Sequence, residues 1–280
     1  MRVGLALGGG GARGLAHLGV LTALTQAGIT IEAVAGTSFG ALVGALYATT
    51  KDPKITCERV LAFLRSPGFR RVSATVHRSR RGIALTRPGL MTEQDYLRLI
   101  ASVVDENTIE ALAVPFAAVA TDLVNGREVV LRAGSIRRAV AASSALPSVF
   151  PPIHVNGRLL VDGGWVNVVP VEAARALGAD VVIAVHTAER MGRRPPLRNG
   201  LDVLRRANDI TRSLLSRHQL AGVDLVIQPD VGEVTWSEFG RAADCIARGK
   251  EAARRIFPVL AARLKTGDLS PRSLRQRARR

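Results

Sequence analysis

The sequence predicts an α/β protein built on a mixed, mainly parallel central sheet. Two apolar runs near the N-terminus, residues 3–7 and 29–35, each lead through a glycine-containing turn into a helical pattern, which is the order of a βαβα unit. Residues 180–186 are apolar without alternation, as in a strand buried on both faces. Strands joined through a helix run parallel to each other, so a parallel core is expected.

The first two strands and the first helix follow from local spacing. Residues 3–7 are interpreted as a buried strand, and the glycine run that follows as a turn. Four leucines recur at helical spacing within residues 13–27, and Gly28 ends this helix. Residues 29–35 then form the second strand, which runs directly into Gly36 and a further apolar helix.

Two more helices and a loop are predicted before residue 103. Asp52 followed by Pro53 is typical of a helix N-cap and first turn, and predicts a helix to residue 64. The basic stretch 66–90 shows no periodicity and is predicted to be a long loop beside the functional site. Residues 92–95 resemble a capping box that opens a helix to residue 103.

The middle of the chain adds antiparallel strands to the sheet. Residues 116–124 and 128–132 are apolar runs joined by Asn-Gly-Arg, which is a hairpin signal and makes the sheet mixed. Ser135 caps a helix to about residue 145, and three prolines then force an irregular segment. A short strand over residues 158–161 delivers Asp162 at its end.

The remaining elements complete the fold toward the C-terminus. Residues 170–177 predict a helix closed by Gly178, and the buried strand 180–186 follows. A basic, proline-containing loop leads to a long helix, a last strand at residues 225–228, and two C-terminal helices.

Composition is compatible with one large domain. A chain of 280 residues with 47% apolar content can bury a full core, and residues 1–262 are interpreted as this domain, followed by a basic tail at 263–280. Cys57 and Cys245 match neither a disulfide framework nor a zinc-ligand spacing, so no metal or cofactor is expected. Glycines and an arginine interrupt the N-terminal apolar run before a signal peptide is complete, which predicts a cytoplasmic protein.

The formal net charge of +16 suggests a partner, and its distribution narrows the choice. Eight arginines and no acid lie between Glu58 and Glu93, and the tail has seven basic residues against one aspartate. Only 4% of residues are aromatic and none lies in the basic tail, so nucleic acid is not expected. Peripheral contact with an anionic membrane is one hypothesis, since clustered Lys and Arg gain about 1 kcal/mol each there. A basic but merely solvated surface is the alternative. The oligomeric state is left open.

Residues 36–40, Gly-Thr-Ser-Phe-Gly, have the G-x-S-x-G spacing of a nucleophile elbow. In this turn a strand passes sharply into a helix, and bulky side chains two residues before and after the serine would collide, which explains Gly36 and Gly40. The position between a predicted strand and a predicted helix supports the same interpretation. Ser38 is therefore the candidate nucleophile.

The glycine-rich stretch after the first strand is a candidate anion cradle. Gly9, Gly10 and Gly11 place unencumbered backbone N–H groups at the start of a helix, where negative charge is stabilised. With Gly14, the stretch also satisfies the dinucleotide pattern G-x-G-x-x-G, with Glu32 in the place of the ribose-binding acid. That acid should end the second strand, whereas Glu32 lies near its start, which disfavours a nucleotide-binding regulatory protein as the alternative.

Two residues compete for the role of general base. Among the five histidines, His186 ends a buried strand after Asp162 and reproduces the Ser, Asp, His order of an α/β-hydrolase triad. Asp162 is the other candidate, because a carboxylate at a strand end before Gly163 and Gly164 can be desolvated and aligned with a hydroxyl. Both alternatives stay open on the residues alone.

Three stretches taken together resemble a known family. Gly9 to Gly14, then Gly36 to Gly40, then Asp162-Gly163-Gly164, in this order and at these separations, are similar to the motifs of the patatin-like phospholipases. The chain is most similar to the compact bacterial type related to the neuropathy-target-esterase catalytic domain, over about residues 4–184.

The resemblance implies a three-layer αβα sandwich and hydrolysis of acyl esters in lipids by a Ser–Asp dyad without histidine. It assigns Ser38 as nucleophile, Asp162 as general base, and the amides of Gly9 to Gly11 as the oxyanion hole. Arg13 falls on the basic position of the family's first motif, where a structural role in orienting the glycine loop is favoured. His186 departs from the pattern and keeps the triad alternative open.

Overall fold

The structure, a computed structural model, describes residues 1–78, 87–187, 191, 197, 199–221, 223 and 225–266. In this part of the chain, eight strands form one sheet in the order β5-β6-β3-β2-β1-β7-β8, with β4 also paired to β3. The strands are β1 (Val3–Leu7), β2 (Ile31–Thr37), β3 (Phe116–Asp122), β4 (Glu128–Leu131), β5 (Ile153–Val155), β6 (Arg158–Asp162), β7 (Val181–Val185) and β8 (Leu225–Ile227).

The sheet is parallel at its centre and antiparallel at one side. β1 pairs parallel with β2 and β7, β2 with β3, and β7 with β8. β4 and β6 pair antiparallel with β3, and β5 antiparallel with β6. The predicted mixed, mainly parallel sheet is confirmed, including the hairpin between β3 and β4.

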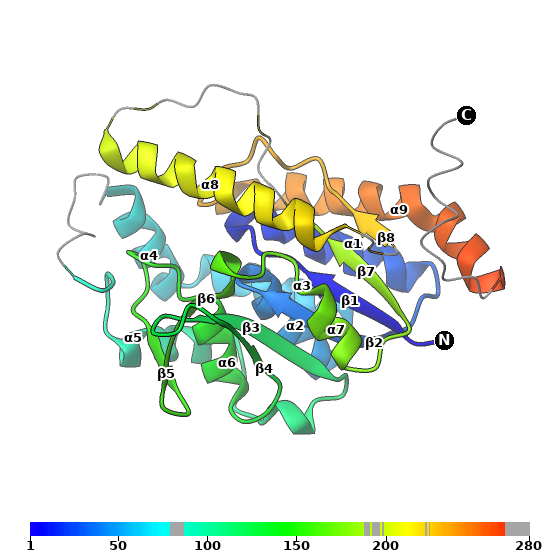
Figure 1. Cartoon of the computed structure of the whole chain (residues 1–280), viewed down its shortest axis with the longest axis horizontal. Coiled ribbons are helices and arrows are strands. Elements are labelled where there is room, and N and C mark those ends of the chain that lie inside the picture. Colours follow the sequence, from blue (N-terminus) through cyan, green and yellow to red (C-terminus); the bar gives the residue numbers. More distant parts are fainter. Residues whose placement is uncertain are drawn as a thin grey trace.

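Helices cover both faces of the sheet and give a three-layer α/β fold, as predicted (Figure 1). One face carries a large core to which α1 (Ala16–Gln26), α2 (Phe39–Thr50), α3 (Pro53–Arg65), α5 (Glu93–Ala101), α6 (Ile136–Ser143) and α9 (Ala242–Thr266) contribute. The other face packs against α7 (Val171–Ala176) and α8 (Gly200–Gln219). The alternation of strand side chains explains the two layers, since Leu5 and Leu7 face the large core and Ala6 the smaller one.

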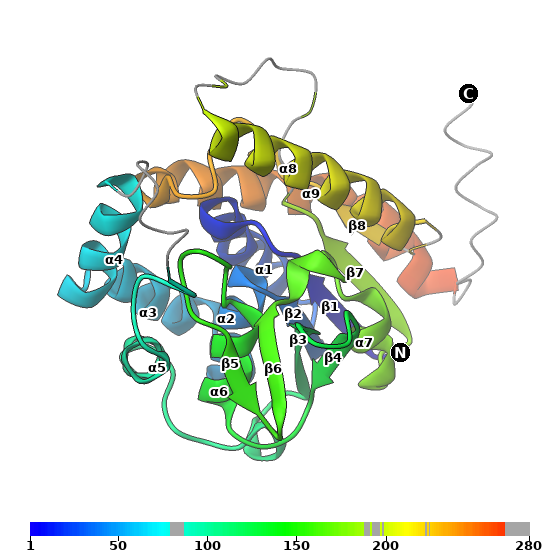
Figure 2. The same ribbon diagram turned by 60° about the vertical axis from the view of Figure 1, so that its left-hand side comes forward.

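The N-terminal and C-terminal helices pack unusually closely. A Cβ atom on Gly19 of α1 would lie 2.0 Å from the carbonyl oxygen of Ile246 in α9. A Cβ atom on Gly249 of α9 would in turn lie 2.0 Å from the carbonyl oxygen of Ala16. Glycine is therefore required at both positions, and the two backbones touch along the layer shown beneath α8 in Figure 2.

The prediction that residues 66–90 form a loop is wrong for its first half. Residues Pro67–Arg78 form helix α4, which Ser66 caps by accepting the Phe69 N–H at 3.2 Å. Phe69 and Val72 pack against the large core, whereas Arg70 and Arg71 face solvent. These contacts of its apolar face stabilise the short helix α4, whose arginine-rich composition did not predict a helix. Residues 79–86 lie outside the described part.

The C-terminal region also differs from prediction. After one turn of 3-10 helix, η6 (Phe239–Arg241), a single helix α9 runs to Thr266 and includes Pro258. The proline removes one backbone donor, but α9 packs against α1, and Ala253 and Leu260, on either side of the proline, are buried in the large core. The predicted tail at 263–280 begins inside α9, and its residues from 267 lie outside the described part.

None of the helices in the described ranges combines the length and the apolar character that crossing a bilayer requires.

Candidate active site

Ser38 occupies a sharp turn between β2 and α2. Its backbone has φ 56° and ψ −125°, in the region that non-glycine residues rarely adopt. A Cβ atom on Gly36 would lie 2.5 Å from the backbone of Ala41, and one on Gly40 would lie 2.2 Å from the carbonyl oxygen of Leu7. The steric requirement that the G-x-S-x-G spacing suggested is therefore present in the fold.

The structure brings Ser38 and Asp162 together from elements 124 residues apart. The Ser38 hydroxyl donates a hydrogen bond to Asp162 Oδ2, with Oγ and Oδ2 2.5 Å apart. Asp162 ends β6, and its other carboxylate oxygen, Oδ1, accepts the Gly164 N–H at 2.8 Å. The Thr121 hydroxyl donates to the Asp162 carbonyl oxygen at 2.8 Å and fixes the main chain beneath it.

The carboxyl of Asp162 is almost fully buried, and this burial raises its pKa above the ordinary value of an aspartate. Three groups lower the pKa of Asp162 and so oppose the effect of burial: the guanidinium of Arg212 in α8, the Ser38 hydroxyl and the Gly164 amide. A carboxylate that is partly desolvated but aligned with a hydroxyl is a better proton acceptor than one in water.

A second serine holds the main chain of the turn. The Ser38 N–H donates to Ser143 Oγ at 3.0 Å, and the Ser143 hydroxyl donates to the carbonyl oxygen of Val119 at 2.6 Å. Ser143 is fully buried at the end of α6. It thus links the strained turn to β3, a function that its position in the sequence did not reveal.

The glycine turn after β1 differs in one respect from the sequence prediction. The Gly9 N–H donates to the Val168 carbonyl oxygen at 2.9 Å and is unavailable to a substrate, because the neighbouring main chain already satisfies it. The amides of Gly10 and Gly11 have no acceptor among the described residues, and both residues border the same pocket as Ser38. Gly9 was therefore wrongly included among the oxyanion donors.

Close neighbours explain why the turn needs its glycines. A Cβ atom on Gly10 would lie 2.4 Å from Thr187 Oγ1, and one on Gly11, whose φ is +56°, would lie 2.4 Å from the Trp236 carbonyl oxygen. The Ala12 N–H donates to that same carbonyl oxygen at 2.7 Å. Gly14 approaches the ring of Phe39.

Arg13 is buried and fastens the turn to distant parts of the chain. Its Nε donates to the Thr187 carbonyl oxygen at 3.2 Å and its Nη1 to the Val234 carbonyl oxygen at 3.1 Å. These bonds to main-chain carbonyls match the structural role that was favoured for Arg13, and the side chain also borders the pocket at Ser38.

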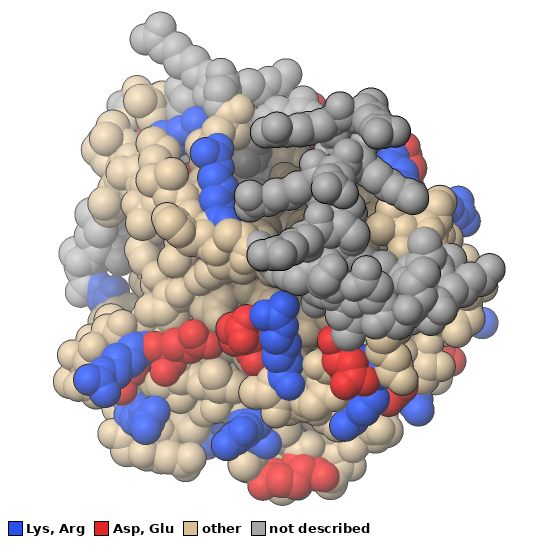
Figure 3. All heavy atoms as spheres, turned by 45° about the vertical axis from the view of Figure 1, so that its right-hand side comes forward, with Lys and Arg blue, Asp and Glu red and all other residues tan. Residues whose placement is uncertain are grey.

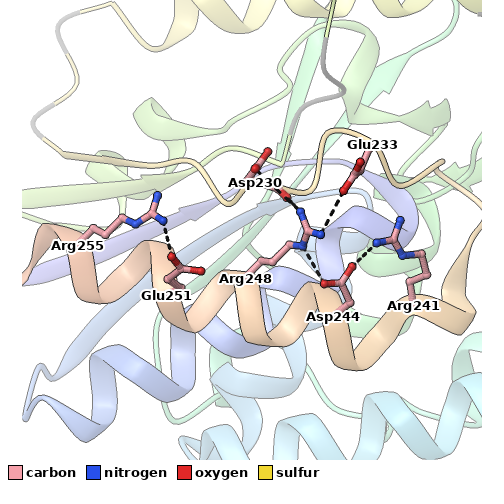
Figure 4. A network of polar contacts seen from close by, with 7 residues as sticks. All are labelled: Asp230, Glu233, Arg241, Asp244, Arg248, Glu251 and Arg255. Atoms are coloured by element: carbon pink, nitrogen blue, oxygen red, sulfur yellow. Dashed lines mark hydrogen bonds and ion pairs between the residues drawn. The ribbon is translucent and has the colours of Figure 1, made fainter. Parts of the chain in front are cut away.

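The loop that carries Val234 and Trp236 is fixed by the ion-pair network in Figure 4. Arg248 of α9 contacts Asp244 at 2.8 Å, Glu233 at 3.1 Å and the Asp230 carbonyl oxygen at 2.6 Å. Asp244 also pairs with Arg241. Through this network α9 holds residues 230–238 against the glycine turn.

His186 lies near the site without joining the dyad. Both carboxylate oxygens of Asp162 are occupied by Ser38 and Gly164, and no hydrogen bond joins His186 to either residue among the described contacts. Burial, with the nearby guanidinium groups of Arg13 and Arg212, lowers the pKa of His186 to about 4. The imidazole is therefore neutral at pH 7, and the geometry does not support the Ser-Asp-His alternative.

The nucleotide alternative also lacks support in the geometry. Glu32 lies near the start of β2, beside the start of β1, and forms an ion pair with Arg2 at 3.3 Å. The glycine turn follows the opposite end of β1, so Glu32 is at the wrong edge of the sheet to contact a ribose bound there. Within the described ranges, no three His, Cys, Asp or Glu side chains are arranged to hold a metal ion.

An apolar cavity opens on one side of Ser38. It encloses about 750 Å³, including its open mouth, and its walls come mainly from α2, α3, α4, α5 and the segment around Phe239. Phe69 of α4 contacts Phe63 and Phe239 edge to face or tilted, with ring centroids about 5 Å apart. Its lining includes Leu42, Phe63, Phe69, Val72, Leu99, Ile100, Val149, Phe150 and Phe239.

A second pocket, with apolar and charged side chains together, opens on the other side of Ser38, beneath α8. Its charged lining consists of Asp162, Asp209 and three arginines, namely Arg13, Arg205 and Arg212, and Gly10, Gly11, Trp165 and Leu204 also border it. Ser38 is thus placed at the boundary between an apolar cavity and a pocket with cationic side chains. Helix α8 forms one wall of the second pocket, and this helix lies outside residues 4–184, the part of the chain that resembles a known family.

Charges of both signs are mixed on one face of the molecule. Figure 3 shows this face, on which Lys and Arg side chains lie among Asp and Glu side chains. In α4, Arg70 and Arg71 are exposed, but part of the basic stretch 59–87 lies outside the described residues. Net charge alone therefore does not identify a docking surface.

Comparison with known proteins identifies relatives of the chain. The family model "Patatin-like phospholipase" matches residues 5–175. An uncharacterized NTE family protein of Mycobacterium bovis is 36% identical over 190 residues, covering 66% of this chain and 48% of that protein. Lysophospholipase NTE1 of Mycosarcoma maydis is 38% identical over 185 residues, covering 66% of this chain and 10% of that protein. The chain thus spans about half or less of the length of these relatives.

A solved structure is similar in fold. VipD from Legionella pneumophila aligns with a TM-score of 0.52 and 16% sequence identity, covering 91% of this chain and 66% of that protein. The alignment extends past the family-model match, so the shared architecture includes most of the described chain.

Proposed function

Because the chain belongs to the patatin-like phospholipase family, we propose that it hydrolyses carboxylic ester bonds of lipids, with Ser38 as nucleophile and Asp162 as general base. The observation that carries this proposal is the 2.5 Å hydrogen bond from the Ser38 hydroxyl to Asp162, at the boundary between an apolar cavity and a cationic pocket. Ser38 combines backbone at positive φ with a direct hydrogen bond to a buried carboxylate.

The reaction proceeds in two steps. Asp162 accepts the hydroxyl proton while Ser38 Oγ attacks the acyl carbonyl carbon, and the protonated Asp162 then delivers this proton to the departing alcohol oxygen. A water molecule, deprotonated by Asp162, attacks the acyl-serine ester, and the protonated Asp162 returns this proton to Ser38 Oγ as the fatty acid departs. The negative charge on the carbonyl oxygen in each tetrahedral intermediate is received by the amides of Gly10 and Gly11.

The two pockets orient the substrate. The acyl chain enters the cavity lined by Phe69 and Val72, where mostly apolar side chains surround it. The alcohol part of the ester lies in the opposite pocket, where Arg205 and Arg212 complement a phosphate group. This arrangement, with a relative named as a lysophospholipase, favours a phospholipid or lysophospholipid over a neutral ester. Such a substrate also implies peripheral contact with a lipid surface.

An activity-based label and three variants test the proposal. A fluorophosphonate is expected to label the wild-type protein and to fail on Ser38→Ala, and both Ser38→Ala and Asp162→Asn are expected to lose hydrolysis of a p-nitrophenyl ester. His186→Gln is expected to keep hydrolysis, because its imidazole does not contact the dyad. Loss of activity in His186→Gln with survival in Asp162→Asn would assign the base to histidine. Equal labelling of Ser38→Ala would refute the serine-hydrolase mechanism.

A further inference from the structure

Helix α8 turns polar side chains toward the pocket and leaves large apolar side chains outward. Asn208, Asp209 and Arg212 line the pocket at Ser38, and Leu215 near the C-terminal end packs against the smaller core. Three large apolar side chains are nevertheless about half exposed, namely Val203 at 52%, Ile210 at 46% and Leu214 at 55%, and Leu204 at the pocket rim is 63% exposed. A helix on the surface of a globular protein normally shows the reverse arrangement.

The exposed residues form one stripe along the helix. Val203, Ala207, Ile210 and Leu214 follow each other at spacings of four, three and four residues, and all four are exposed. At 1.5 Å per residue the stripe is about 16 Å long. Figures 1 and 2 both show α8 at the outer border of the molecule, with no other described element over it. Isolated apolar residues on a surface are ordinary, whereas a contiguous row of this kind marks an interaction surface.

The stripe begins at the mouth of the candidate site. Leu204 borders the same pocket as Ser38 and Asp162, and so does Trp165, which is 43% exposed. A tryptophan and a leucine at the rim of a pocket are side chains that partition into the boundary between headgroups and acyl chains. The apolar surface is therefore continuous with the entrance to the pocket.

The C-terminal end of the stripe is basic. Of the four arginines of α8, Arg205 and Arg212 line the pocket at Ser38, and Arg217 is exposed at the C-terminal end, beside Leu214. Arginine side chains beside an apolar row can extend their guanidinium groups to lipid phosphates while their aliphatic stems lie along the apolar surface. This charge distribution complements an anionic lipid surface.

We infer that the outer face of α8, with Leu204 and Trp165 at its pocket end, is the surface by which this protein docks on an anionic lipid bilayer. The helix lies in the interface with Val203, Ile210 and Leu214 among the outer parts of the acyl chains. The orientation of the pocket mouth toward the lipid rests on the proposed function, whereas the docking itself depends only on the exposed side chains.

Vesicle co-sedimentation of the full chain, carried out in the Ser38→Ala background to prevent hydrolysis, tests this docking surface. Vesicles of phosphatidylcholine with about 30 mol% phosphatidylglycerol provide the anionic surface, and pure phosphatidylcholine provides the comparison. Ile210→Ser combined with Leu214→Ser removes apolar area without changing charge and is expected to lower the partition coefficient about tenfold or more. Thr211→Ser combined with His218→Ser, at exposed polar positions of the same helix, is the matched control and should change it less than about twofold.

Both variants alter only exposed side chains, so circular dichroism should show unchanged folding. The same two pairs of substitutions, made in the protein that keeps Ser38, should hydrolyse a short soluble ester as the wild type does. Absence of esterase activity in the wild type and in both of these Ser38-containing variants, with stripe-dependent vesicle binding intact, refutes the proposed function and leaves the docking surface standing. Equal vesicle binding by the stripe variant and its control overturns the docking proposal. Sedimentation of the parent as a dimer that the stripe variant dissociates also overturns it, because a second copy then covers the stripe.

Discussion

Replacing His186 by glutamine is predicted to make the protein less sensitive to acid while leaving ester hydrolysis intact. His186 is 6% exposed, and its Nδ1 has no hydrogen-bond partner among the described residues. Burial, reinforced by the guanidinium groups of Arg13 and Arg212, lowers its pKa from 6.5 to about 4. The folded protein therefore holds this imidazole neutral over a range in which the unfolded chain protonates it.

The magnitude follows from proton linkage. Below pH 6.5 the unfolded state binds more protons at this histidine than the folded state does, so the free energy of unfolding falls as the pH falls toward 4. Between pH 7 and pH 4.5 a single group with these two pKa values lowers the free energy of unfolding by about 2 kcal/mol. Below about pH 4 both states are protonated and the decrease ends.

Urea unfolding at pH 7 and pH 4.5 measures the effect. The difference in unfolding free energy between the two pH values is expected to be smaller in His186→Gln than in the wild type by about 2 kcal/mol. His218→Gln, at an exposed position of α8, should show the wild-type difference. An unchanged difference in His186→Gln contradicts the reasoning about burial. A loss of esterase activity greater than about tenfold in this variant contradicts the assignment of Asp162 as the base.

Four further substitutions test other parts of the structure. Arg212→Gln removes a charge that lowers the pKa of Asp162, so the acidic limb of the kcat/KM profile for a soluble ester should move to higher pH; an unmoved limb argues against this coupling. Ser143→Ala leaves a buried N–H without its acceptor and should lower the free energy of unfolding in urea by about 1–3 kcal/mol, whereas no measurable loss contradicts the contact. Gly40→Ala places a Cβ atom 2.2 Å from a carbonyl oxygen and should lower the midpoint of thermal unfolding by several degrees, which calorimetry can check. Val72→Trp fills part of the apolar cavity and should lower kcat/KM for long-chain esters relative to short-chain esters; an unchanged ratio places the acyl chain elsewhere.

The parts of the fold that the sequence predicted are those governed by local rules. Strand ends, glycine at positive φ and helix caps at Asp52 and Ser135 each depend on a few neighbouring residues. The residues alone left the general base open between Asp162 and His186, and the pairing of Ser38 with Asp162 came from the resemblance to the patatin-like phospholipases. The glycine requirements of the two motifs are steric and are therefore visible in residue type.

The missed features depend on contacts between distant parts of the chain. Helix α4 is stabilised by the packing of Phe69 on Phe239, which is 170 residues away in the sequence. The arginines between its apolar residues make the short helical periodicity hard to recognise in the sequence. Arg212 has no motif around it, and its importance comes from the position of α8 over Asp162. The Gly9 N–H donates to the Val168 carbonyl oxygen, and a hydrogen bond between two main-chain groups cannot be predicted from the pattern of side chains.

The close packing of α1 on α9 has a consequence for folding during synthesis. The glycine turn receives its final support from Trp236 and Val234, and the loop that carries them is tied to α9, which packs on Gly19 near the N-terminus. Contacts between residues so far apart in sequence form late and slow the folding reaction. During synthesis, Ser38 and Asp162 therefore leave the ribosome before the last quarter of the chain, and the glycine turn beside them can be completed only after that last quarter has been made.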